Sequence, residues 1–185
     1  MSRFNLQPIV RTLVAVTGAF VFAAGAQAAG DKTAYDQHKA TAKSTYDAAK
    51  KQCDAMSGNA KDICEAEAKA ARKKTEATAE ADYKNTPKAR QEAADDIADA
   101  EYDVAKERCD DKAGNDKDVC VKEAKAARDK VKADAKAQKD TTKARTEATE
   151  DKNKVAYKAE VEKCDAMSGD AKTACTNQAK AKYKQ

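Results

Sequence analysis

The stretch CDAMSGNAKDIC, residues 53–64, decides the fold of this chain. It returns as CDDKAGNDKDVC at residues 109–120 and as CDAMSGDAKTAC at residues 164–175, so one cassette occurs three times. Each copy begins and ends with a cysteine and carries a glycine five residues after the first cysteine. Because glycine adopts the left-handed conformation that often follows a helix end, each cassette is predicted to reverse the chain between two helices.

The residue after each glycine supports this prediction. It is Asn59, Asn115 or Asp170, and asparagine and aspartate are preferred N-caps for a following helix. The two cysteines of a copy are equally far from the turn, which in antiparallel helices places them at the same height, about 7.5 Å from the turn. Six cysteines allow many pairings. The symmetry about each turn favours the local set of disulfides, namely Cys53–Cys64, Cys109–Cys120 and Cys164–Cys175.

Helical spacing on the flanks predicts which side chains face the partner helix. A tyrosine stands seven residues before each first cysteine, and these tyrosines are expected in the seams between helices: Tyr46, Tyr102 and Tyr157. Met56 continues the first of these series beyond Cys53. On the return helix one stripe is predicted to consist of Cys120, Ala124, Ala127, Val131 and Ala135. Small alanines allow the close approach of axes that a disulfide needs.

Residues 1–28, MSRFNLQPIVRTLVAVTGAFVFAAGAQA, are predicted to be a secretory signal peptide. They combine Arg3 and Arg11, a short apolar run over 13–24, and the small-residue motif Ala26-Gln27-Ala28. Cleavage is expected near Ala28, with an uncleaved membrane anchor as the alternative. The mature chain is then periplasmic or secreted, without stable membrane insertion, because no other apolar run is long enough to span a bilayer. An even number of cysteines agrees with an oxidising compartment.

The composition after residue 28 limits both the core and the partners. Without Arg3 and Arg11 the 36 basic residues fall to 34, against 32 acidic ones, and this interspersed balance argues against a nucleic-acid partner. No Leu, Phe or Trp follows residue 28. Burial of an alanine methyl contributes little, whereas a Leu or Phe contributes about 1.5–3 kcal/mol. Each bridge is therefore expected to supply a large share of stability, about 3 kcal/mol.

The spacing of the cassettes divides the chain into a signal peptide, 1–28, and three hairpin repeats, 29–85, 86–140 and 141–185. Six helices are predicted, near 31–56, 60–84, 88–112, 116–140, 143–168 and 171–184. Pro87 fits the first turn of a helix with Asn85 or Thr86 as its cap. The matching junction near 140–142 lacks the proline, so a break and a continuous helix both remain open there. The fold class is all-α, with three disulfide-bridged αα-hairpins in tandem, elongated or loosely bundled.

The sequence offers no candidate for catalysis, cofactor binding or metal binding. The only histidine is His38, in a polar helical stretch, and it is expected to be solvated. A zinc site would need closer ligand pairs or more histidines. A reactive thiol would need a neighbouring base or a Cys-x-x-Cys motif. We therefore expect no enzyme, no metal and no cofactor, and we assign all six cysteines to disulfides.

The Ala/Lys/Glu-rich helices behind a signal peptide, with three Cys-x10-Cys cassettes, resemble small exported proteins of Gram-negative bacteria labelled TolA-like or cell-envelope proteins. The likeness to TolA covers only the composition of its long central helical segment. TolA keeps an uncleaved anchor and a folded C-terminal binding domain, and neither is evident here. No functional residue is carried over.

A second likeness, in ATAKSTYDAAKKQ and AKAARKKTEATAEAD, is to late-embryogenesis-abundant desiccation proteins, which typically lack cysteines.

Two functions follow as expectations. The first is a non-catalytic periplasmic structural or interaction protein of the cell envelope, whose partner is an unknown envelope protein or a second copy of the chain. It rests on the signal peptide, the bridged hairpins and the lack of residues for a pocket-forming core. The alternative is a stress or desiccation protectant, which the low apolar content and repeated polar helical segments suggest.

Overall fold

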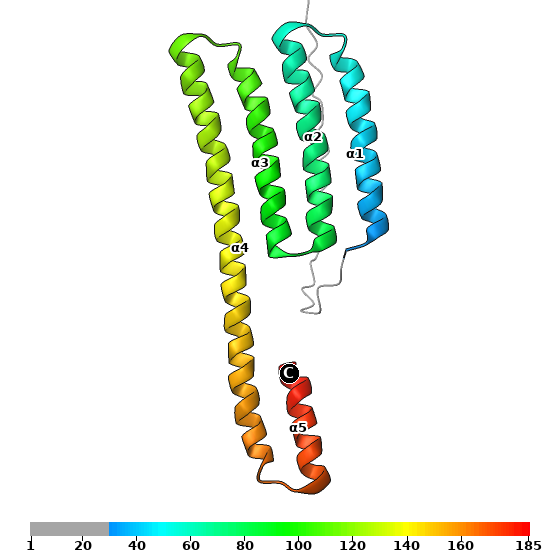
Figure 1. Cartoon of the computed structure of the whole chain (residues 1–185), viewed down its shortest axis with the longest axis vertical. Helices are drawn as coiled ribbons and strands as arrows, with labels where there is room; N and C mark the ends of the chain where they lie inside the picture. The colour runs from blue at the N-terminus through cyan, green and yellow to red at the C-terminus, as the bar shows by residue number, and fades with distance from the viewer. Residues whose placement is uncertain (1–29) are drawn as a thin grey trace, which may run out of the picture.

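The computed structural model describes residues 30–185, so the predicted signal peptide, 1–28, lies outside the described residues. The described chain is all helical (Figure 1). The five helices are α1 (Lys32–Cys53), α2 (Gly58–Lys84), α3 (Pro87–Cys109), α4 (Gly114–Cys164) and α5 (Gly169–Tyr183). Three disulfides join consecutive helices at α1–α2, α3–α4 and α4–α5. The expected class, an all-α chain of tandem bridged hairpins, is confirmed.

The helices form a single layer. Among residues 30–185, each helix packs only against the helices next to it in sequence. Figure 1 shows α1, α2, α3 and the first half of α4 side by side and antiparallel, while α4 continues far beyond the others. Helix α5 turns back along the second half of α4, on the side of α4 where α3 also lies. The molecule is therefore elongated, and both broad faces of the layer are open to solvent.

The turn between α2 and α3 is built by local chemistry. Asn85 ends α2 in the left-handed conformation, with φ of 46°, and its amide donates to the carbonyl of Ala81. Thr86 is the N-cap of α3, and its Oγ1 accepts a hydrogen bond from the amide of Ala89 at 3.1 Å. Pro87 follows in the first helical position, where its missing N–H costs nothing. The predicted restart at Pro87 is confirmed.

The corresponding junction in the next repeat does not break. Helix α4 runs without interruption through residues 140–142, so the second of the two open alternatives is correct and residues 30–185 form five helices instead of six. Thr142 stands at the position of Pro87. In the same alignment Asp140 stands at the position of the left-handed Asn85, and it remains within the helix. A stretch with neither device continues as helix because its alanines, lysines and glutamates favour that state.

The bridged turns differ from the expectation in one detail. Each second helix begins at the cassette glycine, and Gly58 has φ of +57°, with Gly114 and Gly169 close to that value. The N-cap is therefore Ser57 in the first copy, in an extended conformation and without a side-chain hydrogen bond. The prediction that Asn59, Asn115 and Asp170 are caps was wrong, because the left-handed glycine already reverses the chain one residue earlier.

The buried residues are small. The buried side chains of residues 30–185 are alanines, one valine and the first cysteine of each cassette: Ala42, Cys53, Ala68, Ala77, Ala79, Ala81, Ala89, Ala93, Ala98, Val104, Cys109, Cys164 and Ala179. Ala77, Ala81 and Ala93 form one cluster between α2 and α3, against which Ile97 packs. Met56, placed in a seam by its spacing, is 46% exposed because it lies past the end of α1. The core is thin, as the composition predicted.

Candidate functional site

The three bridged turns are the most regular feature of the described chain. The paired Cα atoms lie 5.5 Å apart in Cys53–Cys64 and 5.7 Å apart in Cys109–Cys120 and Cys164–Cys175. These are the local pairings that the symmetry of the cassette favours, and no free cysteine stands in residues 30–185. The first cysteine of each pair is at most 1% exposed, so the sulfurs fill the space that a large apolar side chain normally fills.

An ion pair crosses each bridged turn. The Nζ–Oδ1 distance is 3.3 Å for Lys61 and Asp54, 3.1 Å for Lys117 and Asp110, and 2.9 Å for Lys172 and Asp165. These pairs were not predicted from the sequence. Their signal was present, since every cassette has an aspartate directly after its first cysteine and a lysine three residues before its second. Each turn is therefore closed twice, by a covalent bridge and by a charge pair on its outer side.

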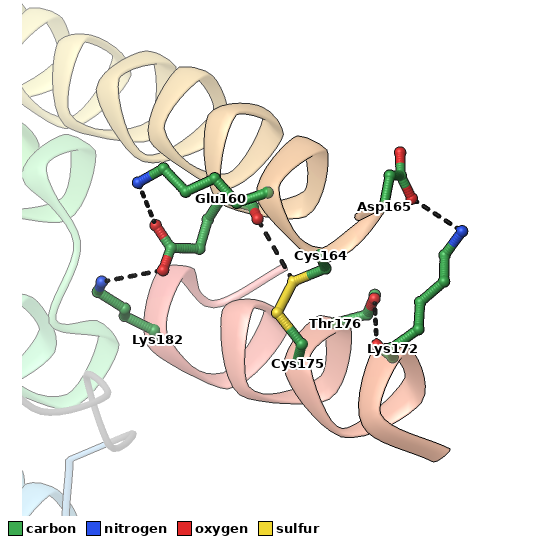
Figure 2. Close-up of a disulfide and its surroundings, with 8 residues drawn as sticks. Glu160, Cys164, Asp165, Lys172, Cys175, Thr176 and Lys182 are labelled. Carbon is green, nitrogen blue, oxygen red and sulfur yellow. Dashed lines mark hydrogen bonds and ion pairs between the residues drawn. A yellow bond between two sulfur atoms is a disulfide. The ribbon is translucent and has the colours of Figure 1, made fainter. Parts of the chain in front are cut away.

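The first two turns lie together, and the third lies at the opposite end of α4 (Figure 1). Asn59 Nδ2 of the first turn donates to Asp111 Oδ1 of the second at 2.6 Å, which ties the two hairpins together at that end. Figure 2 shows the third turn, where Lys182 reaches from α5 to Glu160 of α4 with an Nζ–Oε1 distance of 3.9 Å. The third hairpin is thus held by its own contacts alone.

The tyrosines before the first two bridges pack under arginines. The Arg72 guanidinium carbon lies 5.4 Å from the centroid of the Tyr46 ring, and that of Arg128 lies 4.8 Å from the centroid of Tyr102. Both pairs join the two helices of one hairpin and serve as cation–π contacts. The expectation that these tyrosines lie in the seams holds, with arginine as the partner that the sequence analysis did not identify.

The return stripe of the second hairpin is corrected by these contacts. Cys120, Ala124 and Ala135 are half-buried, as expected, but Ala127 is exposed and Val131 is 42% exposed. Arg128, half-buried beside Tyr102, takes the place predicted for Ala127. The physical reason is that the stripe advances by four residues from Ala124, so the long arginine stem covers the seam while its charged end reaches acidic neighbours.

The open end of the first hairpin is closed by an aromatic pair. The rings of Tyr35 and Tyr83 stack with centroids 5.0 Å apart. Beside them the Gly30 amide donates to the Tyr83 carbonyl at 2.8 Å, and a Cβ on Gly30 would lie 2.6 Å from the Tyr83 Cα. Asp31 then caps α1 by accepting from the Thr33 amide at 2.8 Å. The start of the described chain is therefore docked onto the end of α2.

The acidic middle of α3 is neutralised from both sides. Residues 91–105 contain six acidic side chains and no basic one. From α2, Lys73 pairs with Asp96 at 3.0 Å, and from α4, Lys132 pairs with Asp99 at 2.7 Å. The acidic charges of α3 are thus paired with lysines of the helices on both sides of it.

A groove of about 730 Å³ runs along one face of α2 and α3, with Tyr46 of α1 at its edge. It is open to solvent, and charged side chains of both signs line it, including Lys73, Glu76, Asp96 and Asp103. Exposed charges of this kind bind ions and polar groups weakly, because several of them already have a partner, such as Lys73 with Asp96 and Arg72 with Glu76, and water screens the others. The groove has no histidine or cysteine among its lining residues.

Three exposed ion pairs shift the pKa of their carboxylates. The hydrogen bond from Arg128 holds the pKa of Asp129 below its ordinary value, and the hydrogen bond from Lys136 does the same for Asp140. The Lys84 ammonium lies 2.7 Å from Glu80 and lowers the pKa of that carboxyl. All three carboxylates are ordinary anions at neutral pH, poised as partners of cations and not as proton donors.

Other candidates for chemistry are dispersed. His38 lies exposed on α1. Asp95 receives a hydrogen bond from Gln91 Nε2 on Oδ2 at 3.1 Å, and its Oδ1 is buried without a partner. Within the part of the chain that the structure describes, no group of three or more His, Cys, Asp or Glu side chains is arranged to hold a metal ion. None of the five helices combines the length and apolarity needed to cross a bilayer.

No protein-family model, curated protein or solved structure matches this chain.

Proposed function

We propose that this chain is a non-catalytic exported protein of the cell envelope, which acts as a bridged helical spacer and interaction surface in the periplasm. The observation that carries the proposal is the set of three disulfides, each at the turn of a hairpin whose core is alanine. Disulfides persist in oxidising compartments and are rare in the cytosol. The leader sequence of residues 1–28 supports the same compartment.

The shape of the molecule supports the role of a spacer and surface. A layer one helix thick exposes two broad faces, and α4 alone spans 51 residues, about 75 Å. Ion pairs join α3 to α2 and to α4 along the layer, while the disulfides hold the hairpins in place of a thick apolar core. A protein of this form has a long helix and two exposed faces on which a partner can bind. Its groove is open to solvent and lined by charged side chains.

The compartment is tested by expressing the full chain with a C-terminal tag in a Gram-negative host. We expect the tagged protein in the periplasmic fraction, beginning at Ala29, with the three local bridges in a non-reducing peptide map. The matched control replaces Ala26 and Ala28 by aspartate, which removes the small residues that cleavage needs and should retain the leader. A cytosolic chain with free thiols would contradict the proposal.

The interaction role is tested in the same cells. Chemical cross-linking of intact envelopes followed by mass spectrometry should recover the tagged chain joined to itself or to a defined envelope protein. Recovery of the chain without any cross-linked partner, from cells in which it is abundant and oxidised, would contradict a structural role.

The protectant alternative is favoured by one observation: over residues 30–185 the buried side chains are alanines, cysteines and one valine, with none larger. Circular dichroism separates the two functions. A spacer is highly helical in dilute oxidised buffer, whereas a protectant gains its helix only when water is withdrawn. High helix content before drying would support the spacer, and a coil spectrum with intact bridges would support the protectant.

A further inference from the structure

One side of α4 has no neighbour along its whole length. Figure 1 shows α3 and α5 on the same side of α4, which leaves the other side open. We call ten exposed residues on that side the free face of α4; they are Ala126, Lys130, Ala133, Ala137, Thr141, Ala144, Ala148, Lys152, Val155 and Ala159. By helical spacing the exposed acidic residues Glu123, Asp134, Asp151 and Glu162 lie on the same side. Val155, at 67% exposed, is the most exposed large apolar side chain of the described residues.

The free face is straight because its residues repeat every eleven positions. Ala126, Ala137, Ala148 and Ala159 are each eleven residues apart, and the same spacing relates Ala133, Ala144 and Val155. An eleven-residue period corresponds to about 3.67 residues per turn, close to the α-helical value, so the residues stay on one side of the helix. The face extends over about 50 Å.

The same residues are buried elsewhere in the chain. One cassette spacing separates Ala77 and Ala81 of α2 from Ala133 and Ala137 of α4, and Ala93 of α3 from Ala148. In α2 and α3 these residues form the buried cluster between two antiparallel helices. On α4 their counterparts are exposed, because the uninterrupted helix keeps its two halves from packing against each other. The alanines that pack between α2 and α3 therefore have counterparts on α4 that pack against no other helix of residues 30–185.

A second, antiparallel α4 fits this face residue for residue. With a two-fold axis between Thr142 and Lys143, Ala137 lies opposite Ala148 of the other copy, as Ala81 lies opposite Ala93 between α2 and α3. All ten residues of the free face pair with one another under this axis. A two-fold interface requires such self-complementarity, since each contact must occur twice.

The flanking charges agree with this arrangement at one pair and depart from it at others, since the axis also places Asp134 opposite Asp151 and Glu123 opposite Glu162. Arg108 pairs with Glu67 across α2 and α3, and the counterparts of these residues are Lys163 and Glu123, which keep opposite charges. The counterparts of Lys73 and Asp96 are Asp129 and Asp151, which repel, although Arg128 already neutralises Asp129 at 2.6 Å.

Lys152 replaces the apolar Ile97 of the seam between α2 and α3. The alkyl stem of a lysine covers apolar surface while its ammonium reaches water.

We propose that two copies of this chain associate through the free face of α4, with each third hairpin packing on the second hairpin of the other copy. A face about 50 Å long and about 10 Å wide buries about 1,000 Å² in total, the size at which specific interfaces begin. The arrangement deepens the proposed interaction role by naming a second copy as partner, and it does not depend on the compartment.

The test is the mass of the full chain, purified with its three bridges intact, measured by light scattering over about a hundredfold range of concentration, because dimerisation follows mass action. We expect a dimer that dissociates on dilution. Replacing Ala137 and Ala148 by glutamate together places carboxylates opposite each other and should give a monomer. Glutamate favours helix, and both sites are exposed in the single chain, so circular dichroism should remain unchanged.

The matched control is Ala127→Glu, at an exposed alanine of α4 outside the free face, which should leave the dimer intact. Ala126→Glu with Ala159→Glu tests the ends of the face and should also give a monomer. A wild-type protein that is monomeric at every concentration would overturn the proposal. This includes a monomer in which α4 breaks at 140–142 and its two halves pack against each other. A dimer that survives both paired substitutions would overturn it as well. Leader cleavage and bridge mapping are scored separately, so a failed dimer leaves the proposed compartment standing.

Discussion

Lys172 Nζ lies 2.9 Å from Asp165 Oδ1 across the third bridged turn, eight residues of turn and helix being closed by one ion pair. Both side chains are about half exposed, at 48% and 50%. Water therefore screens their attraction, and pairs of this kind contribute about 0–1 kcal/mol. The disulfide beside it contributes about 3 kcal/mol by restricting the unfolded chain. The bridge dominates the stability of the turn, and the ion pair mainly orients it.

The first prediction concerns that ion pair. Asp165→Asn should lower the free energy of unfolding by less than about 1 kcal/mol, because an exposed pair is lost and no buried charge remains. Urea titration followed by circular dichroism measures the change. Asp54→Asn and Asp110→Asn, at the equivalent positions, should give equally small changes. If the free energy of unfolding fell by several times this amount at any of the three positions, the ion pair and not the disulfide would be the main stabiliser of the turn.

The second prediction concerns the third bridge. Replacing Cys164 and Cys175 by serine should unfold α5 locally, because this helix of 15 residues packs only on α4 and loses about 3 kcal/mol of restraint. Amide hydrogen exchange over residues 169–183 should become fast. The matched control replaces Cys109 and Cys120, where α3 keeps its packing on α2, so its amides should stay protected. Equal loss of protection at both sites would contradict this reasoning.

The third prediction concerns the docked start of the chain. Gly30→Ala should displace residues 30–31 from α2, because the new Cβ would lie 2.6 Å from the Tyr83 Cα and 2.7 Å from the Asp82 carbonyl oxygen. The hydrogen bond from the Gly30 amide is then lost, at a cost of about 1 kcal/mol. We expect a lower midpoint of thermal unfolding and faster hydrogen exchange at the Tyr35 amide. Ala34→Ser, on the next turn, serves as the conservative control, and an unchanged Gly30→Ala variant would contradict the close packing.

The fourth prediction concerns acid. Hydrogen bonds and nearby cations lower the pKa of Glu80, Asp129 and Asp140. A carboxylate with a lower pKa in the folded state than in the unfolded chain stabilises the fold at neutral pH, and this contribution is lost as the pH falls through the folded-state pKa. The thermal midpoint should therefore decrease below about pH 4. In Glu80→Gln the decrease should be smaller, and a midpoint that rises on acidification would contradict the assignment.

The bridged turns show how much local sequence determined. Each cassette has a glycine at its turn, two cysteines equally far from that turn, and alanine-rich flanks. These features act within about a dozen residues, so the helices, the chain reversal and the local disulfides could be predicted without tertiary information. The glycines do adopt positive φ, and the cysteines do meet at the predicted height. The Asp–Lys pairs could have been read as well, since both residues recur in every cassette.

Other features required the packed structure. The arginine partners of Tyr46 and Tyr102 depend on how far the return helix is rotated, and a shift of one residue separates Arg128 from the predicted Ala127. The sorting of charges around α3 depends on which helices are neighbours. Sequence spacing describes one helix at a time, and these contacts belong to pairs of helices.

By itself the sequence determined an all-helical chain with three bridged reversals and a thin alanine core. Only the tertiary structure decided that the helices lie in one layer and that α4 passes through residues 140–142 unbroken. The physical reason is the same for both. Contacts between alanines hold two helices together but bury too little apolar area to hold a second layer of helices. Helix α4 continues through residues 140–142 because that stretch has neither a proline nor a residue in the left-handed conformation to end the helix.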